Sequence, residues 1–148
     1  MTAPEPFDLV VIGAGPAGER GAAQAASIGK RVCLIERAPK PGGAAVNTSA
    51  IPSKTLRETA RYLAGLRQRG LHAVDLHVRS GVSLADFMQR ERPTIETEWE
   101  RIAANVAQHG ITTIQGSARF VDRHSVEVSR YGTEPRLVTG RHFLVATG

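Results

Sequence analysis

The feature that most constrains the fold is a glycine-rich segment that directly follows an apolar run. Residues 7–12 (FDLVVI) are mostly large and apolar, and GAGPAG follows at 13–18. Such a run is typical of a strand buried on both faces of a parallel sheet. Residues 16–29 are rich in alanine and end in glycine, which predicts a helix, and residues 31–36 (RVCLIE) predict a second buried strand. Strand, turn, helix and strand in this order predict a βαβ unit with parallel strands.

The spacing of the three glycines meets the mechanical demands of a dinucleotide-binding turn. Gly13 allows a sharp turn, Gly15 lets a pyrophosphate approach the backbone, and Gly18 permits close packing of helix on strand. Pro16 and Ala17 begin the helix, whose free amides attract phosphate charge. The alternative is a purely structural glycine turn, because glycine-rich turns are common.

An acidic residue stands where a nucleotide ribose would need one. Glu36 lies 18 residues after Gly18, at the end of the second predicted strand. A carboxylate there accepts hydrogen bonds from the 2′- and 3′-hydroxyls of an adenosine ribose and repels a 2′-phosphate. The sequence therefore predicts a site for FAD or NAD rather than NADP, and the alternative is a solvated acid without a ligand.

The middle of the chain is predicted to be helical. Residues 53–68 carry apolar or small side chains at helical spacing, with Ser53 or Thr55 as the N-terminal cap. A longer helical segment is predicted over 83–108, where Pro93 is expected to kink or split it. Its apolar stripe is interpreted as core rather than as a ligand platform and comprises Leu84, Phe87, Met88, Ile95, Trp99, Ile102 and Val106.

The last third changes to strand periodicity. After Gly110 ends the helix, a short strand is predicted at 111–115. Short antiparallel strands are then predicted at 120–121, 125–128 and 136–138, with turns at Asp122-Arg123 and Tyr131-Gly132, before a final buried strand at 143–146. We therefore predict one α/β domain over residues 1–148, with a parallel sheet and a β-meander inserted before its last strand.

Composition bounds the classes of function. The net charge is +5, but the basic residues are spread along the chain and aromatic residues make up only 5% of it. A solvated basic surface is therefore favoured over a nucleic-acid-binding face. No apolar run approaches the roughly 20 residues that a membrane span needs, and the N-terminus lacks the basic start of a secretory signal. We expect a cytoplasmic protein without nucleic-acid or membrane partners.

Other reactive side chains form no recognisable constellation. The five histidines show no metal-ligand spacing, and none stands in a recognisable arrangement with Ser53, so neither a metal site nor a serine nucleophile is predicted. The single cysteine, Cys33, lies among apolar residues and is interpreted as core. The acids of the long helix are interpreted as a solvated face with helix ion pairs, and they are Glu91, Glu96, Glu98 and Glu100.

A second glycine segment adds a family resemblance. Residues 41–54 read PGGAAVNTSAIPSK, with GSARF at 116–120 and ATG at 146–148. Together with the first glycine loop, these segments resemble the FAD-binding part of the class I pyridine nucleotide–disulfide oxidoreductases. Within that family the first loop, with Glu19 where lipoamide dehydrogenases usually carry an aromatic residue, is most similar to the transhydrogenases.

The resemblance implies a three-layer, Rossmann-like FAD-binding domain and a role for each matching residue. Glu36 would bind the adenosine ribose, Gly42 and Gly43 would approach the FAD pyrophosphate, and Thr48 and Lys54 would lie along the flavin. Lys54 is the one catalytic residue predicted, because an ammonium beside the reactive flavin nitrogen stabilises negative charge on the reduced flavin. The full set of cofactor-binding residues is Gly13, Gly15, Pro16, Ala17, Gly18, Glu36, Arg37, Gly42, Gly43, Ala44, Ala45, Thr48, Lys54, Ala118, Ala146, Thr147 and Gly148.

Two positions depart from the disulfide-active members of the family. Those members carry a Cys-x-x-x-x-Cys pair just before Ile-Pro-Ser-Lys, and here the two positions hold Ala45 and Ala50. Thiol–disulfide exchange has no redox pair, which disfavours dihydrolipoamide, glutathione and mercuric reductase activities. Hydride transfer between NADPH and NAD⁺ through FAD needs no thiol, so a transhydrogenase-like activity is the favoured interpretation.

Two other interpretations stay open. One is a non-catalytic dinucleotide-binding module or half of a split protein, and the other is a dihydrolipoamide dehydrogenase-like relative without its redox cysteines. The family's NAD(P)(H) site, its dimerisation domain and the last strand of its FAD domain have no counterpart in these 148 residues. The resemblance thus implies an N-terminal fragment truncated before the last sheet strand, inactive alone and part of a homodimer when full length.

Overall fold

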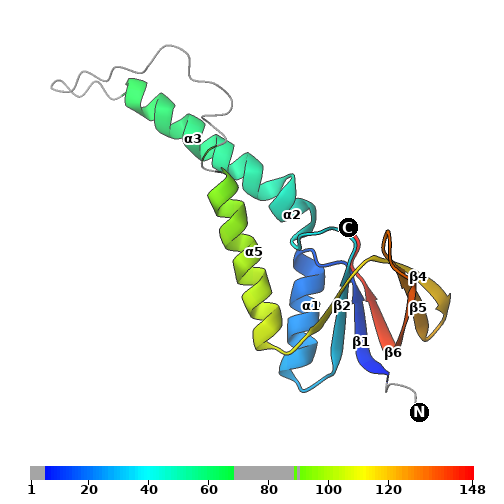
Figure 1. Cartoon of the computed structure of the whole chain (residues 1–148). Helices are drawn as coiled ribbons and strands as arrows, with labels where there is room; N and C mark the ends of the chain where they lie inside the picture. Colours follow the sequence, from blue (N-terminus) through cyan, green and yellow to red (C-terminus); the bar gives the residue numbers. More distant parts are fainter. Residues whose placement is uncertain (1–5, 69–88, 90) are drawn as a thin grey trace.

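The computed structural model describes residues 6–68, 89 and 91–148, which form a sheet with helices packed on one side of it (Figure 1). Helix α3 extends well away from the sheet. The elements in chain order are β1 (Phe7–Ile12), α1 (Pro16–Ser27), β2 (Val32–Glu36), α2 (Gly43–Asn47), α3 (Ala50–Gln68), α5 (Glu91–Gln108), β3 (Thr112–Gln115), β4 (Ser117–Asp122), β5 (Ser125–Ser129) and β6 (Arg136–Val145).

The six strands follow the order β3-β2-β1-β6-β5-β4. Strand β1 is central and pairs in parallel with β2, where Val10 lies opposite Cys33, and with β6, where Val10 lies opposite Phe143. Strand β3 adds in parallel to β2, and β5 and β4 continue the sheet in antiparallel pairing. The predicted α/β fold with a parallel sheet is confirmed, and the glycine loop follows the carboxyl end of its central strand.

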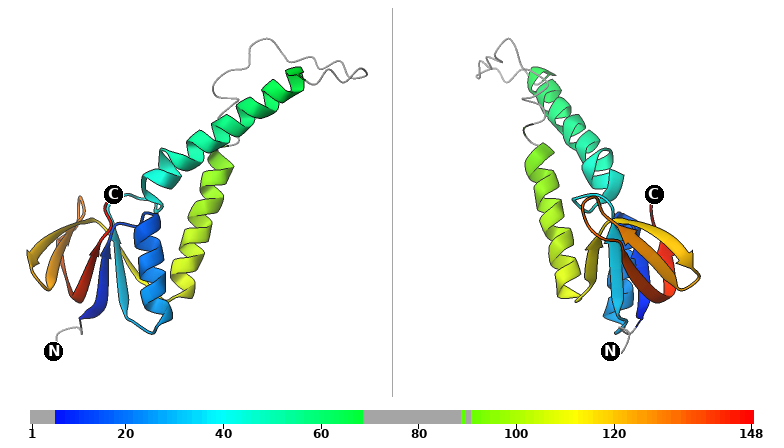
Figure 2. Two further views of the ribbon diagram at one scale, coloured as in Figure 1. Left: turned by 180° about the vertical axis from the view of Figure 1, so that it is seen from behind. Right: turned by 45° about the vertical axis from the view of Figure 1, so that its right-hand side comes forward.

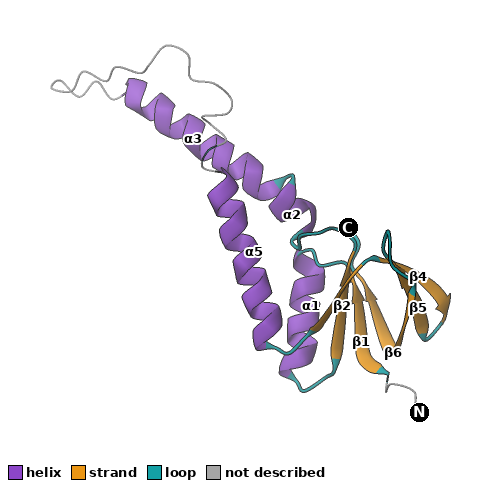
Figure 3. Cartoon of the chain, in the orientation of Figure 1, coloured by secondary structure: helices purple, strands orange, loops and turns teal. Residues whose placement is uncertain are grey.

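The molecule has three layers: the helices, the parallel strands and the antiparallel meander of β4, β5 and the first half of β6 (Figures 2 and 3). One apolar cluster lies on each face of the parallel strands. Successive side chains of a strand point to opposite faces, so Val11 and Leu34 join the helix-side cluster while Val10 and Cys33 join the other. The helix-side cluster consists of Val11, Ala14, Ala22, Val32, Leu34, Val46, Ile102, Val106 and Ile111. The meander-side cluster consists of Val10, Cys33, Ile35, Val126, Val128 and Val138.

The prediction of two separate strands at the end of the chain is wrong. Separate strands are predicted at 136–138 and 143–146, but the structure has the single strand β6. Its first half pairs antiparallel with β5 and its second half pairs in parallel with β1. Gly140 lies where the two pairings meet, and a Cβ there would stand 2.6 Å from Val10 Cγ2. This glycine allows close approach to β1, so the chain continues in one strand instead of breaking.

The prediction that Ser53 or Thr55 caps the first central helix is wrong. Helix α3 begins at Ala50 rather than near residue 53, so Ser53 and Thr55 lie inside it. Their hydroxyls donate to carbonyl oxygens of the preceding turn, Ser53 Oγ to Ala50 at 3.2 Å and Thr55 Oγ1 to Ile51 at 3.0 Å. Both side chains therefore bond back along the helix, as serine and threonine do in helix interiors.

Helix α5 corrects two further expectations. It begins at Glu91, so Pro93 lies in its first turn, where a missing N–H leaves no helical bond unmade and no kink is needed. Glu91 is buried instead of solvated, while the ion pair of Glu98 with Arg101 is confirmed at 2.7 Å. The stripe residues Ile95, Trp99, Ile102 and Val106 do join the core, and Leu84, Phe87 and Met88 lie outside the described residues.

Among the helices of the described residues, none combines the length and apolar character that crossing a bilayer requires.

Candidate dinucleotide-binding site

Two glycines of the first loop are required by the fold itself. Gly13 has φ +105°, a region that favours glycine, and a Cβ there would overlap the carbonyl oxygen of Ala146. A Cβ at Gly18 would overlap the carbonyl oxygen of Gly13 and lie 3.3 Å from Val11 Cγ1. The turn and the end of β6 therefore explain Gly13, and the packing of α1 on β1 explains Gly18.

Gly15 differs, because neither its backbone nor its neighbours require a glycine. It is the N-cap of α1 with φ −72° and ψ −179°, a conformation open to any residue. Its absent Cβ would meet Gly43 Cα at 3.9 Å, an ordinary van der Waals contact. The backbone N–H groups of Ala17 and Gly18 have no hydrogen-bond partner within the described part of the chain. Gly15 thus leaves space open beside unsatisfied donors.

A second glycine segment passes close to the first. Gly42 and Gly43 have φ of +102° and +55°, and the Gly42 N–H donates to the carbonyl oxygen of Ala14 at 2.8 Å. A Cβ at Gly43 would lie 3.1 Å from Gly15 Cα. Helix α2 begins at Gly43, and sequence analysis missed it because five residues show no helical periodicity. The two glycine segments predicted to bind pyrophosphate are therefore adjacent.

Glu36 lies at the carboxyl end of β2, fixed by three backbone groups. Its Oε2 accepts the Ala14 N–H at 2.7 Å and its Oε1 accepts the Ala38 N–H at 2.8 Å. Its own carbonyl oxygen accepts the Gly116 N–H at 2.8 Å, which brings the start of the GSARF segment beside it. Each carboxylate oxygen retains acceptor capacity for a hydroxyl. The carboxylate is half-buried and is held against the glycine loop, and its ribose-binding role stays a prediction.

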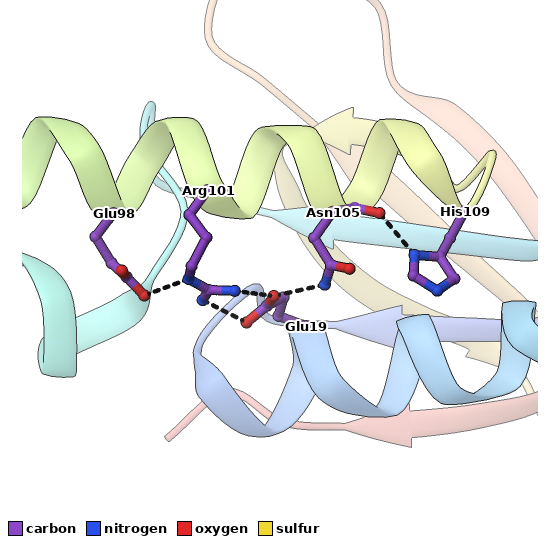
Figure 4. Close-up of polar contacts among 5 residues, drawn as sticks. All are labelled: Glu19, Glu98, Arg101, Asn105 and His109. Carbon is purple, nitrogen blue, oxygen red and sulfur yellow. Dashed lines mark hydrogen bonds and ion pairs between the residues drawn. The ribbon is translucent and has the colours of Figure 1, made fainter.

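Glu19 is a buried charge in the first turn of α1, and sequence analysis assigned it no contact (Figure 4). Arg101 of α5 donates through Nη1 to Oε1 at 3.1 Å and through Nη2 to Oε2 at 3.2 Å, and Asn105 Nδ2 donates to Oε1 at 2.7 Å. Burial alone would raise the pKa of Glu19, but the hydrogen bonds from Arg101 and Asn105 outweigh it and lower the pKa below its ordinary value. The sequence signal was an acid three residues before Ala22, on the small-residue face of the helix.

A second polar contact joins α5 to the second glycine segment. Trp99 Nε1 donates to Asn47 Oδ1 at 2.9 Å, and Asn47 Nδ2 donates to the carbonyl oxygens of Pro41 and Gly43 at 3.1 and 2.9 Å. The ammonium of Lys40 lies 4.8 Å from the centroid of the Trp99 ring. Trp99 is core as predicted, and it also holds the loop that carries Gly43.

The remaining predicted residues surround the loops to different degrees. Ala44 and Ala45 lie in α2, and Thr48 is its exposed C-cap. The Ala146 N–H donates to the carbonyl oxygen of Ile12 at 2.9 Å, beside Gly13, and Thr147 follows it. Ala118 is partly buried against the meander-side cluster, while Arg37 and Gly148 are exposed.

Lys54 lies in the second turn of α3. Its exposed side chain lines a cleft of about 260 Å³ between α3 and α5, together with Ile51, Thr55, Glu58, Thr59 and Thr94. Among the described residues, no hydrogen bond or ion pair joins Lys54 to the Gly13–Gly18 loop or to Gly42 and Gly43. The flavin-proximal role predicted for it rests on the family resemblance alone.

The one cysteine of the chain, Cys33, lies in the core. Cys33 is fully buried as predicted, and desolvation raises the pKa of its thiol to about 11. The two positions of the family's cysteine pair hold Ala45, which lies within α2, and Ala50, which begins α3. Within the described ranges, no group of three or more His, Cys, Asp or Glu side chains is arranged to hold a metal ion.

Comparison with known proteins decides the family. Residues 7–148 match the family described as pyridine nucleotide-disulphide oxidoreductase. The chain belongs to this family. Among its curated members, the soluble pyridine nucleotide transhydrogenase of Mycobacterium bovis (strain BCG / Pasteur 1173P2) is 38% identical over 143 residues, and that of Azotobacter vinelandii is 30% identical over 142 residues. Each alignment covers 96% of this chain.

A solved flavoprotein structure shares the fold. The Cu(II) complex of the HOCl-induced flavoprotein disulfide reductase of Escherichia coli superposes with a TM-score of 0.79 and 26% sequence identity over 98% of this chain. That match covers 29% of the reductase, and the chain spans 31% and 30% of the two transhydrogenases. The family resemblance and the Rossmann-like flavoprotein fold predicted from the sequence are confirmed.

Proposed function

We propose that this chain is the FAD-binding part of a flavoprotein oxidoreductase that moves a hydride between NADPH and NAD⁺. The observation that carries the FAD site is Gly15, whose missing side chain neither the backbone nor the packing explains. A pyrophosphate lying against the backbone of Gly15 explains it, because the phosphate oxygens need close approach to the backbone there. The unsatisfied amides of Ala17 and Gly18 supply matching donors at the N-terminus of α1.

The residues around this space fit the rest of an FAD molecule. Glu36 would accept hydrogen bonds from the adenosine ribose while its other lone pairs stay with Ala14 and Ala38. By family resemblance, Thr48 and Lys54 would lie along the flavin, where the ammonium would stabilise negative charge. When bound, FAD supplies the hydride acceptor and donor that protein side chains lack.

The absence of the family's redox cysteine pair supports a transhydrogenase rather than a disulfide reductase. Ala45 and Ala50 replace the redox pair, and Cys33 is buried with a raised pKa. Hydride transfer requires neither thiol, and the two curated relatives above are named as transhydrogenases. The proposal further includes an NAD(P)(H) site outside these residues, a homodimer for the whole protein and, because those relatives are named soluble, a cytoplasmic location.

FAD retention by the purified chain tests the binding site. We expect FAD to remain after removal of the excess, seen by flavin absorbance and fluorescence, and Gly15→Ala to weaken binding at least about tenfold, or about 1.4 kcal/mol. Gly65→Ala is the matched control, because a Cβ on that helical glycine meets nothing within 4 Å. A folded chain that binds no FAD would contradict the proposal, and equal binding by Gly15→Ala would contradict the pyrophosphate position.

Hydride transfer is tested in a longer chain that includes the nicotinamide-binding part. Lys54→Met should slow flavin reduction by NADPH more than it weakens FAD binding, because the ammonium acts on charge that develops during reduction. Arg57→Met removes another exposed cation from the same helix and should leave both quantities unchanged. If Lys54→Met changes only FAD affinity, its catalytic role is wrong. Dye reduction without NADPH-to-NAD⁺ transfer would favour a diaphorase.

A further inference from the structure

A buried carboxylate stands one helical turn from the proposed pyrophosphate. The Glu19 N–H donates to the carbonyl oxygen of Gly15 at 2.9 Å, so Glu19 belongs to the first turn of α1. Its side chain is 3% exposed. A negative charge in this turn opposes the field that attracts phosphate to a helix N-terminus, and burial leaves it poorly screened. Uncompensated, Glu19 would weaken the very site that Gly15 leaves open.

Arg101 compensates this charge from another helix. Its guanidinium donates to both carboxylate oxygens of Glu19, at 3.1 and 3.2 Å, in the bidentate geometry that makes arginine–carboxylate pairs strong. Its Nε donates to Glu98 at 2.7 Å. Glu98 lies on α5 itself and its side chain is 28% exposed, so solvent screens it far better than it screens Glu19.

We propose that Arg101 is a positioning residue for the dinucleotide: by holding and neutralising Glu19, it keeps the phosphate-facing end of α1 receptive to an anion. This inference rests on the proposed function, because it concerns the same site. It assigns a specific purpose to a contact between residues 82 positions apart in the sequence. It also makes α5, which contributes no glycine and no ribose contact, part of the cofactor site.

Charge-changing variants separate this role from simple support of the fold. Glu19→Gln removes the negative charge and leaves Arg101 paired with Glu98, so FAD should bind two- to fivefold more tightly. Arg101→Met removes the ion pair of Glu19 and leaves it only the hydrogen bond from Asn105, so FAD should bind at least tenfold more weakly. The double variant Glu19→Gln/Arg101→Met has neither charge and should return to within about threefold of the unchanged chain. A role confined to fold support predicts weaker binding for all three.

Two matched controls remove the same groups elsewhere. Glu98→Gln deletes the other carboxylate bound to Arg101, and Arg119→Met breaks the 3.0 Å ion pair with Glu127 on the meander. Each should change FAD affinity less than twofold. FAD titrations at low and high salt supply a further readout, because screening should move the affinities of Glu19→Gln and Arg101→Met toward each other. Melting temperatures of the FAD-free proteins report the structural cost separately.

The outcomes distinguish the inference from the proposed function. No FAD binding by the unchanged, folded chain overturns both. FAD binding with weaker affinity for Glu19→Gln, or with no recovery in the double variant, overturns the inference alone. If Arg101→Met fails to fold, Glu19→Gln and the double variant still decide it, since the first must tighten binding and the second must restore it.

Discussion

The two faces of the central sheet are held in different ways. On the meander face, the buried cluster contains only apolar side chains and the Cys33 thiol, and its strands β4, β5 and β6 follow one another in sequence. On the helix face, the apolar cluster is accompanied by polar contacts of α5 with Glu19 and Asn47, which span 82 and 52 residues. Both faces bury the sheet, and the side-chain hydrogen bonds from α5 to Glu19 and Asn47 lie on the helix face.

The two faces therefore contribute differently to the stability of the fold and to the geometry of the site. Apolar burial is non-directional, so the apolar cluster on the meander face stabilises the sheet without requiring particular distances and angles. Hydrogen bonds and ion pairs require particular distances and angles, and those of α5 fix α1 and the loop before α2 relative to each other. We therefore expect changes on the meander face to lower stability alone and changes on the helix face to lower stability and FAD affinity together.

The largest effect should come from Gly18→Ala, which breaks the helix face at its closest contact. The new methyl group would overlap the carbonyl oxygen of Gly13, so α1 must move away from β1. We expect at least about 4 kcal/mol lower free energy of unfolding, within the range of severe backbone clashes, and loss of FAD binding. Denaturant unfolding followed by circular dichroism measures the first quantity.

Gly65→Ala controls for the chemical change itself. Gly65 lies in α3 without positive φ, and a Cβ there meets nothing within 4 Å. Alanine should raise stability by about 1 kcal/mol through helix propensity. If both alanines destabilise equally, the clash at Gly18 is not the cause.

A smaller effect is expected from Val126→Ala, which opens a cavity on the meander face. Val126 is fully buried between the sheet layers, and its truncation should cost about 2–3 kcal/mol in free energy of unfolding. FAD affinity should change less than twofold. Ile102→Ala on the helix face should cost about 2–5 kcal/mol and also weaken FAD binding, because α5 contacts both glycine segments. Equal FAD affinities for the two variants would contradict the division between the faces.

Much of the fold and of the candidate site can be predicted from local patterns in the sequence. The strands that become β1 and β2 are largely apolar runs, and the glycine loop and Glu36 have fixed spacing, so each is predictable from a short segment. The outcome for Glu36 is the clearest, since its carboxylate lies where the sequence predicts, held by Ala14 and Ala38. The distinction between Gly15 and Gly18, by contrast, needs coordinates, because both are glycines of one motif and only neighbouring atoms separate their reasons.

Contacts between distant segments account for what sequence analysis missed. Strand β6 changes partners at Gly140, which no periodicity reveals, and the burial of Glu91 depends on its packing environment. The pairing of Glu19 with Arg101 requires α1 and α5 to lie side by side, and the sequence of neither helix alone predicts that pairing. The missed residues therefore concentrate on α5, the element that joins the two parts of the site.

The smallest effect is expected from acid, and it should arise on the helix face. Glu19 has a lowered pKa in the folded chain, so its pairing stabilises the fold above the ordinary pKa of a glutamate and is lost as the pH falls through the folded value. The unchanged chain should therefore lose more stability than Glu19→Gln when unfolding is measured from neutral pH to below pH ~4. Asp8 and Asp122 also have lowered pKa values, chiefly through backbone hydrogen bonds from Arg31 and His124, but they titrate in both chains and cancel. Parallel pH profiles for the two chains would mean that the Glu19–Arg101 pair contributes nothing to stability that acid can remove.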